Sequence, residues 1–251
     1  MRRYVLIGLI AVLAAAGLYC GYRYYDDVIR PEQELTAAEE TQTALLDRIR
    51  PAAEEAPVPE DPAAPPEDPL AAAAAVNPAV VGWIRIPGTH IDHPIAQAAD
   101  NDFYLHNGFD GEYNYELGCP FLDCRCASDL GGVNSIVYAH HMNKQRMFAD
   151  IALYKDKSFL EAHPTGELTL HDGVHTVRFF AYLNVPHDHA VYGIADRAGE
   201  KAYLEALFAS ADYVTMTIGD LGREEDLHLL LLSTCTYEYQ DARGVLAGII
   251  E

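Results

Sequence analysis

The residues best suited to chemistry lie where two predicted β-strands end. An apolar run is followed directly by Ser233, Thr234 and Cys235, which supply two hydroxyls and one thiol. Polar side chains at a strand end beside a loop commonly form sites. Arg243 follows eight residues after the cysteine. If the chain returns antiparallel after so short a connection, its guanidinium lies near the thiol, where it could lower the thiol pKa or hold a developing oxyanion. A buried strand cysteine beside a solvated edge arginine would give the same pattern.

A second predicted strand, residues 134–139, also ends in polar groups, His140 and His141. Strand alternation directs Tyr138 and His140 to one side and His141 to the other. A cysteine at one strand end and a histidine at another form the minimum arrangement for thiol nucleophilic catalysis, with imidazole as proton carrier. A histidine alone is more often a satisfied surface or core group, so the hypothesis depends on the pairing of His140 with Cys235.

The composition excludes some functions. Among 251 residues there are 38 acidic and 17 basic ones, with a formal net charge of -21. This balance argues against nucleic acid as a partner, because a phosphate backbone needs a basic surface. Hydrophobic residues make up 50% of the chain, enough to bury a core. Five cysteines are too few for a disulfide scaffold. A disulfide of Cys124 with Cys119 or Cys126 remains open, although Cys-x-Cys geometry along a strand is poor.

Short β-prone runs separated by turn residues fill the second part of the chain and predict a closed barrel or sandwich. Two segments with helical spacing, 147–160 and 200–208, interrupt them. The predicted strands are 80–86, 91–95, 119–123, 134–139, 167–171, 174–185, 213–218, 228–235 and 245–250.

The N-terminal part divides into three predicted units. Residues 1–25 contain nineteen uncharged residues, 4–22, which at ~1.5 Å per residue nearly span a membrane as a helix. Arg2 and Arg3 precede this helix, which predicts a cytoplasmic N-terminus and an extracellular domain. A cleaved signal peptide is the alternative, but the apolar run is long for one.

Residues 26–50 are expected to form a short amphipathic helix that begins near Pro31 and stops at Pro51. Residues 51–76 are rich in proline, alanine and glutamate, which favours an extended linker. Residues 77–251 are expected to form the catalytic domain.

Combined, these motifs resemble the sortase family, membrane-anchored cysteine transpeptidases of Gram-positive surfaces. The likeness depends on Ser233–Thr234–Cys235, on Arg243, and on Tyr138–Ala139–His140, where the family usually has glycine at the alanine position. It covers roughly residue 77 to the C-terminus. The segments most similar to class B sortases are 82–88, 91–95, 101–106, 121–123, 140–142 and 147–148.

The resemblance implies a mostly β fold: a closed barrel of about eight strands with added helices, preceded by a transmembrane helix and a stalk. It implies that Cys235 is the nucleophile that cleaves a C-terminal sorting signal after threonine, that His140 transfers protons, and that Arg243 holds the substrate or oxyanion. No cofactor or metal is required. Partners would be sorting-signal-bearing surface proteins and an amine on a peptidoglycan precursor or pilin. The implied substrate-binding residues are Asn101, Leu105, Tyr138, Ser233 and Thr234.

Other functions remain as alternatives. An L,D-transpeptidase also presents a histidine before a cysteine, but Thr234 replaces the glycine of that family's motif and Arg243 lies too far along. Papain-like proteases place their cysteine before their histidine. A non-catalytic receptor that binds haem or metal could use His187, Asp188 and His189 with Cys124 and Cys126, but such pairs are weak zinc signals.

Overall fold

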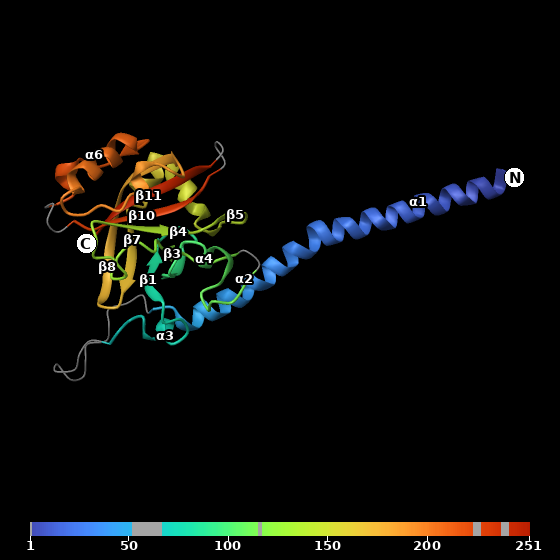
Figure 1. The fold of residues 1–251 in the computed structure, drawn as a ribbon, viewed down its shortest axis with the longest axis horizontal. Helices are drawn as coiled ribbons and strands as arrows, with labels where there is room; N and C mark the ends of the chain where they lie inside the picture. The colour runs from blue at the N-terminus through green and yellow to red at the C-terminus, as the bar shows by residue number, and fades with distance from the viewer. Residues whose placement is uncertain (1, 52–66, 115–116, 223–226, 237–240) are drawn as a thin grey trace.

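The protein is a β-barrel from which one long helix projects (Figure 1). The structure, a computed structural model, describes residues 2–51, 67–114, 117–222, 227–236 and 241–251. The projecting helix ends in the N-terminus, and its near end lies against the barrel (Figure 1).

Eight strands close the barrel in the order β11-β10-β4-β3-β2-β1-β7-β8, and β8 pairs again with β11. The expected closed barrel of about eight strands is therefore confirmed. Most pairs are antiparallel, but β2–β3 and β4–β10 are parallel. The strands are β1 (Val80–Arg85), β2 (Asp92–Ala96), β3 (Phe121–Leu122), β4 (Asn134–Tyr138), β7 (Thr165–Leu170), β8 (Gly173–Pro186), β9 (Tyr213–Val214, outside the barrel on β8), β10 (Leu229–Cys235) and β11 (Ala242–Ile250).

The leucine run of β10 explains how the barrel is covered. Leu230 and Leu232 pack in one core cluster, whereas Leu229 and Leu231 pack in another, with residues of α6 (Glu200–Ser210). Both faces of the strand are thus buried, which is why its sequence is continuously apolar instead of alternating. The predicted helix at 200–208 is confirmed by α6.

The predicted helix over 147–160 is confirmed in part, because the segment is mostly helical but is divided into two helices. This segment contains the end of a small hairpin, then the 3₁₀ helix η2 (Ala149–Lys155), then α5 (Lys157–Ala162). Asp156 separates the two helices: its backbone is extended and its side chain accepts a hydrogen bond from the Ser158 N–H, as an N-cap does. The remaining short elements are α4 (Phe103–His106), β5 (His141–Met142), β6 (Arg146–Met147), η3 (Ala190–Tyr192) and η4 (Ile218–Asp220).

The N-terminal helices are joined. The helices α1 (Arg2–Tyr24) and α2 (Arg30–Ile49) are connected by the π-helical turn η1 (Tyr25–Ile29), so the predicted separate start near Pro31 is wrong. A wider π turn just before Pro31 relieves the clash between the proline ring and the preceding turn. The predicted stop is confirmed, because α2 ends just before Pro51.

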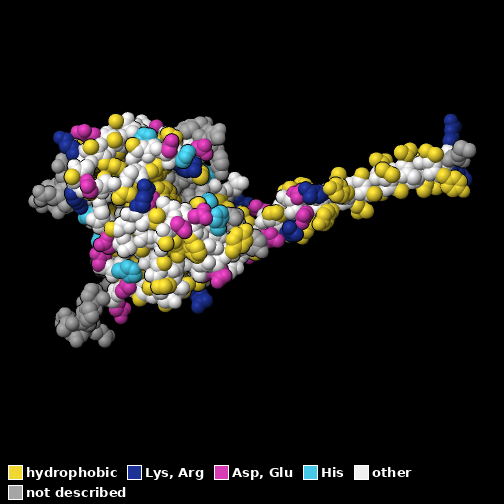
Figure 2. Space-filling view, in the orientation of Figure 1, with side chains coloured by type: hydrophobic (Ala, Val, Ile, Leu, Met, Phe, Trp, Pro, Cys, Tyr) yellow, Lys and Arg dark blue, Asp and Glu magenta, His cyan; other side chains and the backbone are white. Residues whose placement is uncertain are grey.

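The two halves of this long helix have different surroundings. No residue of α1 is buried, and Figure 2 shows apolar side chains along the projecting part. Among the described residues, one helical stretch, Arg2–Ile49, is long and apolar enough to cross a membrane by length and composition. In contrast, α2 buries Leu46 and Ile49 against the barrel.

The predicted linker is only partly described, because residues 52–66 lie outside the described ranges. Its last part does not extend away from the barrel as expected. It forms the short helix α3 (Ala71–Ala74), and Leu70 and Ala73 are fully buried in a cluster with Leu46 and Trp83. Leu46 and Ile49 on the apolar face of α2 pack in the same cluster, so α2 helps to bury Leu70 and Ala73.

Candidate active site

Regular strand pairing brings Cys235 and Arg243 together. The two residues are direct partners in the antiparallel ladder of β10 and β11. The prediction that the Arg243 guanidinium lies near the Cys235 thiol is therefore confirmed. Both side chains are partly exposed at the rim of the barrel.

The strand that precedes His140 lies beside the strand that ends in Cys235. Strand β4 runs parallel to β10, with Tyr138 opposite Ser233. Beyond this pair, the Ala139 N–H donates to the Ser233 carbonyl at 3.2 Å, and the Thr234 hydroxyl donates to the Ala139 carbonyl at 2.8 Å. The two strands consequently deliver their terminal residues to the same place.

One pocket of about 890 Å³ opens at this rim. Its wall includes all eight residues that the sequence nominated, so the structure brings the whole predicted set together. They are Asn101, Leu105, Tyr138, His140, Ser233, Thr234, Cys235 and Arg243.

The His140 ring is held by a segment distant from its own strand in the sequence. Its Nε2 lies 2.8 Å from the Leu105 carbonyl oxygen, which can only accept, so Nε2 carries the hydrogen. Nδ1 is then the nitrogen left to exchange a proton. Gly118, at a φ of 70°, packs against the ring: a Cβ there would lie 3.1 Å from His140 Cδ2 and 2.8 Å from the Tyr104 carbonyl oxygen. The close approach and the left-handed backbone both require glycine.

The opposite wall is built by a network of polar side chains. The hydroxyls of Ser233 and Tyr192 lie 2.9 Å apart. Arg125 donates through Nη2 to the Tyr192 carbonyl at 3.0 Å and to the Asp123 carboxylate at 2.7 Å. Tyr138 donates its hydroxyl hydrogen to the same carboxylate at 3.0 Å. These bonds tie the segment that follows β8 to the strands that carry the site.

This network fixes the charge beneath the pocket. Burial by itself would raise the pKa of Asp123, but hydrogen bonds from Arg125 and Tyr138 outweigh it, so the net pKa lies below its usual value. Burial and the neighbouring Asp123 raise the pKa of Tyr138. Tyr138 is therefore a neutral donor, and the Arg125–Asp123 pair adds no net charge.

Sequence reasoning missed several pocket residues. Arg125 and Tyr192 line it, as do His187 and Asp188, which were considered only as part of a weak metal motif. The position of Arg125, two residues after the 121–123 segment, was the one available signal. Asn101 also has a task beyond the predicted one: its side-chain oxygen accepts the Cys124 N–H at 2.8 Å.

All five cysteines are free, and Cys235 is the one that lines the pocket. Cys119 and Cys126 are buried, and burial raises the pKa of Cys126 to about 11, which makes it an unreactive thiol. The open possibility of a disulfide with Cys124 is not realised.

No family model matches the chain. A sortase B of Listeria monocytogenes is 34% identical over 179 residues, which is 69% of this chain and 70% of the relative. The chain belongs to the class B sortase family. This sortase is a cysteine transpeptidase, and not the L,D-transpeptidase or the receptor considered from the sequence.

Solved structures agree with this assignment. The structure of Clostridium perfringens sortase B matches with a TM-score of 0.65 and 26% identity, over 71% of this chain and 97% of that one. A Streptococcus pyogenes class B sortase involved in pilus biogenesis matches with a TM-score of 0.63 and 26% identity, over 71% and 96% of the two chains.

Proposed function

We propose that this sortase cleaves a C-terminal sorting signal after threonine and joins the new carboxyl end to an amine through a thioacyl intermediate on Cys235. The observation that carries the proposal is the shared pocket, in which Cys235 lies with His140 and Arg243. Among the described residues that line it, Cys235 is the only thiol.

In the first half of the reaction, Cys235 gives its thiol proton to Nδ1 of His140, its sulfur attacks the threonine carbonyl carbon, and the carbonyl oxygen becomes an oxyanion. Arg243 stabilises this charge; its Nη1 donates to the Ala242 carbonyl at 3.1 Å, which holds the guanidinium at the strand edge before the charge develops. The C–N bond then breaks, the leaving amine takes a proton from His140, and a thioester remains.

In the second half, an incoming amine loses a proton to His140 and attacks the thioester carbon. The C–S bond breaks, a new amide forms and the thiolate returns to Cys235. Nε2 of His140 already donates a hydrogen bond to the Leu105 carbonyl oxygen. This supports Nδ1 as the nitrogen that transfers both protons.

The remaining nominated residues would hold the signal peptide. The Tyr138 and Tyr192 rings stack at 6.0 Å and offer an apolar wall. Leu105 lines the pocket beside His140, and Asn101 lines it near the Cys124 backbone. The Ser233 hydroxyl is shared with Tyr192, so it shapes the wall. The hydroxyl of Thr234 is engaged by the backbone, which supports a role in holding the strand ends.

We assign the setting of the enzyme from its N-terminal part. Residues 1–25 would form the cytoplasmic tip and membrane anchor, 26–50 the amphipathic helix, 51–76 the linker and 77–251 the extracellular catalytic domain. Partners would be surface proteins that carry a sorting signal. The acceptor amine would belong to a peptidoglycan precursor or to a pilin, and the likeness to an enzyme involved in pilus biogenesis supports the second source.

A peptide library tests the proposal. The full-length enzyme in detergent micelles should form a mass-detectable thioacyl adduct with a subset of threonine-containing peptides and release the C-terminal fragment. Cys235→Ala should abolish both, whereas Cys124→Ala, a partly exposed thiol outside the pocket, should retain them. Cleavage that persists in Cys235→Ala would contradict the proposed mechanism.

A further inference from the structure

The segment that follows His140 is a small hairpin with a demanding turn. Strands β5 and β6 pair His141 with Met147, and the Phe148 N–H donates to the His140 carbonyl at 3.0 Å, which closes the hairpin onto the histidine. In its turn, Lys144 has a φ of 62° and Gln145 a φ of 57°. Both are non-glycine residues in the left-handed region, so the turn needs outside contacts to hold it.

Helix α2 supplies one such contact. Arg146 of the hairpin donates through Nε to the Glu39 carboxylate at 2.6 Å, and only 4% of its side chain is exposed. Lys144 of the hairpin pairs with Glu32, which lies about two turns before Glu39 in α2. The Arg146 guanidinium also lies 3.9 Å from Glu32, but its contact with Glu39 is much shorter. Because the guanidinium is buried, loss of the Glu39 carboxylate weakens the compensation of its charge, so the Glu39–Arg146 pair helps to fix where the hairpin lies.

The same helix reaches His140 by a second route. The buried Gln42 accepts a hydrogen bond from the Asn114 side chain at 2.7 Å. The Asn114 side chain in turn bonds both backbone groups of Gly118, at 2.9 and 3.2 Å. Gly118 is the residue that packs against the His140 ring. One helix face therefore contacts the hairpin through Arg146 and, through Asn114, reaches the glycine that packs against the imidazole.

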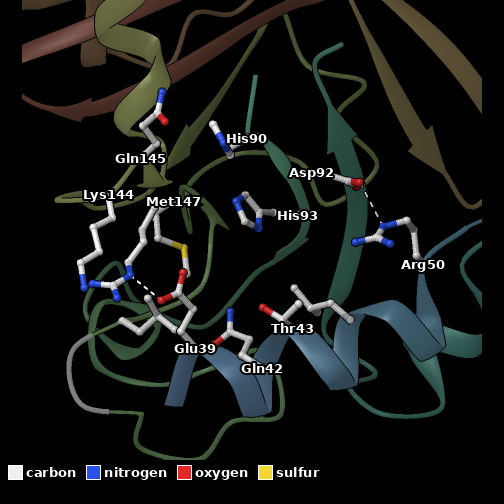
Figure 3. A pocket seen from close by; sticks show the side chains of 13 residues that line it. Glu39, Gln42, Thr43, Arg50, His90, Asp92, His93, Lys144, Gln145 and Met147 are labelled. Carbon is white, nitrogen blue, oxygen red and sulfur yellow. Dashed lines mark hydrogen bonds and ion pairs between the residues drawn. The ribbon is translucent and has the colours of Figure 1, made fainter. Parts of the chain in front are cut away.

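Polar contacts join α2 to the hairpin on this side, while Leu35 of α2 and Met142 of the hairpin each pack against the core cluster that contains Met147. A cavity of about 300 Å³ separates them. Figure 3 shows Glu39 and Gln42 directed from α2 into this cavity, with Lys144, Met147 and His93 on the facing side. The Glu39–Arg146 pair is the polar link that joins α2 to the hairpin beside this cavity.

We propose that Glu39 and Gln42 are positioning residues for His140, through which the helix continuous with the apolar α1 sets the orientation of the imidazole. This inference rests on the proposed role of His140. Neither residue lines the pocket that contains Cys235, and that thiol is placed by the β10–β11 ladder, so the effect is confined to the proton-transferring half of the site.

The full-length enzyme in detergent micelles provides the test, with Glu39→Gln and Gln42→Ala compared with Glu40→Gln. Glu40 is the next residue of α2, carries the same charge and is exposed. Glu39→Gln and Gln42→Ala are each expected to lower kcat roughly 10- to 100-fold, as a displaced catalytic group does. The KM for the signal peptide and the rate of Cys235 labelling by a methanethiosulfonate reagent should stay within about twofold.

Combination with His140→Ala separates this effect from a general structural one. If Glu39 acts through His140, adding Glu39→Gln to His140→Ala should cause no further loss of turnover. Equal kcat values in Glu39→Gln and Glu40→Gln, a further loss in the combined variant, or a parallel fall in Cys235 labelling would overturn the inference. If Glu39→Gln does not fold, Gln42→Ala decides by the same criteria.

Failure of the underlying function would look different. Full turnover in His140→Ala would remove the role of His140 and, with it, this inference. Normal dependence on His140 together with unchanged Glu39→Gln and Gln42→Ala would overturn the inference alone.

Discussion

The two halves of the active site are held in place by different means. Cys235 and Arg243 are opposite each other in a regular ladder, where backbone hydrogen bonds set their separation. His140 lies beyond the end of β4, and its ring is positioned by the Leu105 carbonyl and Gly118. The thiol and guanidinium therefore depend on the barrel, whereas the imidazole depends on distant segments of the chain.

Because of this difference, the position of His140 can be disturbed without unfolding the barrel. The ladder is part of a buried core in which Leu230, Leu232 and Leu246 are fully inaccessible. The supports of His140 are single side-chain contacts that include α2. Substitutions on the two sides should accordingly separate effects on stability from effects on activity.

The largest effect is expected from the catalytic groups themselves. His140→Ala should lower turnover by about 10²–10⁴-fold, the usual contribution of a general acid and base. Arg243→Ala should lower it by about 10²–10³-fold through loss of an oxyanion donor. Because both side chains are partly exposed, the melting temperature should change by only a few degrees.

Peptide cleavage assays and thermal unfolding of the same preparations measure the two quantities. A large fall in melting temperature for either variant would assign that residue a structural role. His175→Ala, a histidine of β8 outside the pocket, is the control and should keep full turnover.

An acid-induced loss of stability is expected on the α2 side. Burial lowers the pKa of His93 to about 4, well below the unfolded value of 6.5. The unfolded chain therefore binds the extra proton first as the pH falls, so native stability is present above pH 6.5 and declines toward pH 4. The loss from this group should be about 2 kcal/mol between pH 7.5 and pH 5.

Urea unfolding at the two pH values, with His93→Gln for comparison, measures this contribution. The variant should lose less stability on acidification than the parent. An equal loss in both proteins would mean that His93 does not contribute to the pH dependence.

The smallest effect tests the support of the imidazole most selectively. Gly118→Ala and Gly111→Ala both force alanine to a positive φ, of 70° and 82°, which should cost each about 1–2 kcal/mol of stability. Gly118→Ala should cost more, because its Cβ would also lie 2.8 Å from the Tyr104 carbonyl oxygen. The nearest atom to a Cβ at Gly111 is 3.9 Å away, whereas at Gly118 the new methyl group would press on His140. Only Gly118→Ala should therefore lower kcat, by roughly tenfold.

Chemical denaturation and steady-state kinetics of the pair decide the point. Equal kcat values in the two variants would show that the contact with Gly118 does not position His140.

The same contrast explains which parts could be predicted from the sequence. The Cys235–Arg243 pair follows from a short connection between two β-prone runs, and α6 follows from its apolar spacing, because both are local patterns. The docking of α2 could not be predicted: its partners Arg146 and Asn114 are about a hundred and about seventy residues away in the chain.

The errors have similar causes. The 147–160 segment has helical spacing, but Asp156 caps a new helix and breaks it. The network of Asp123, Arg125, Tyr138 and Tyr192 joins three segments that only the closed barrel brings together. The continuous α1–α2 helix was missed because Pro31 ordinarily marks a helix start, and the π turn before it leaves no trace in composition.

The central claim concerns distance, and a crystal structure of the full-length enzyme with a sorting-signal mimic disulfide-bonded to Cys235 measures it most directly. We predict that Nδ1 of His140 lies within hydrogen-bond reach of the scissile amine position, directly or through one water molecule, with the Arg243 guanidinium on the threonine carbonyl oxygen. An imidazole too distant from the Cys235 sulfur for one water molecule to bridge, with Nδ1 turned away from the pocket, would contradict the account.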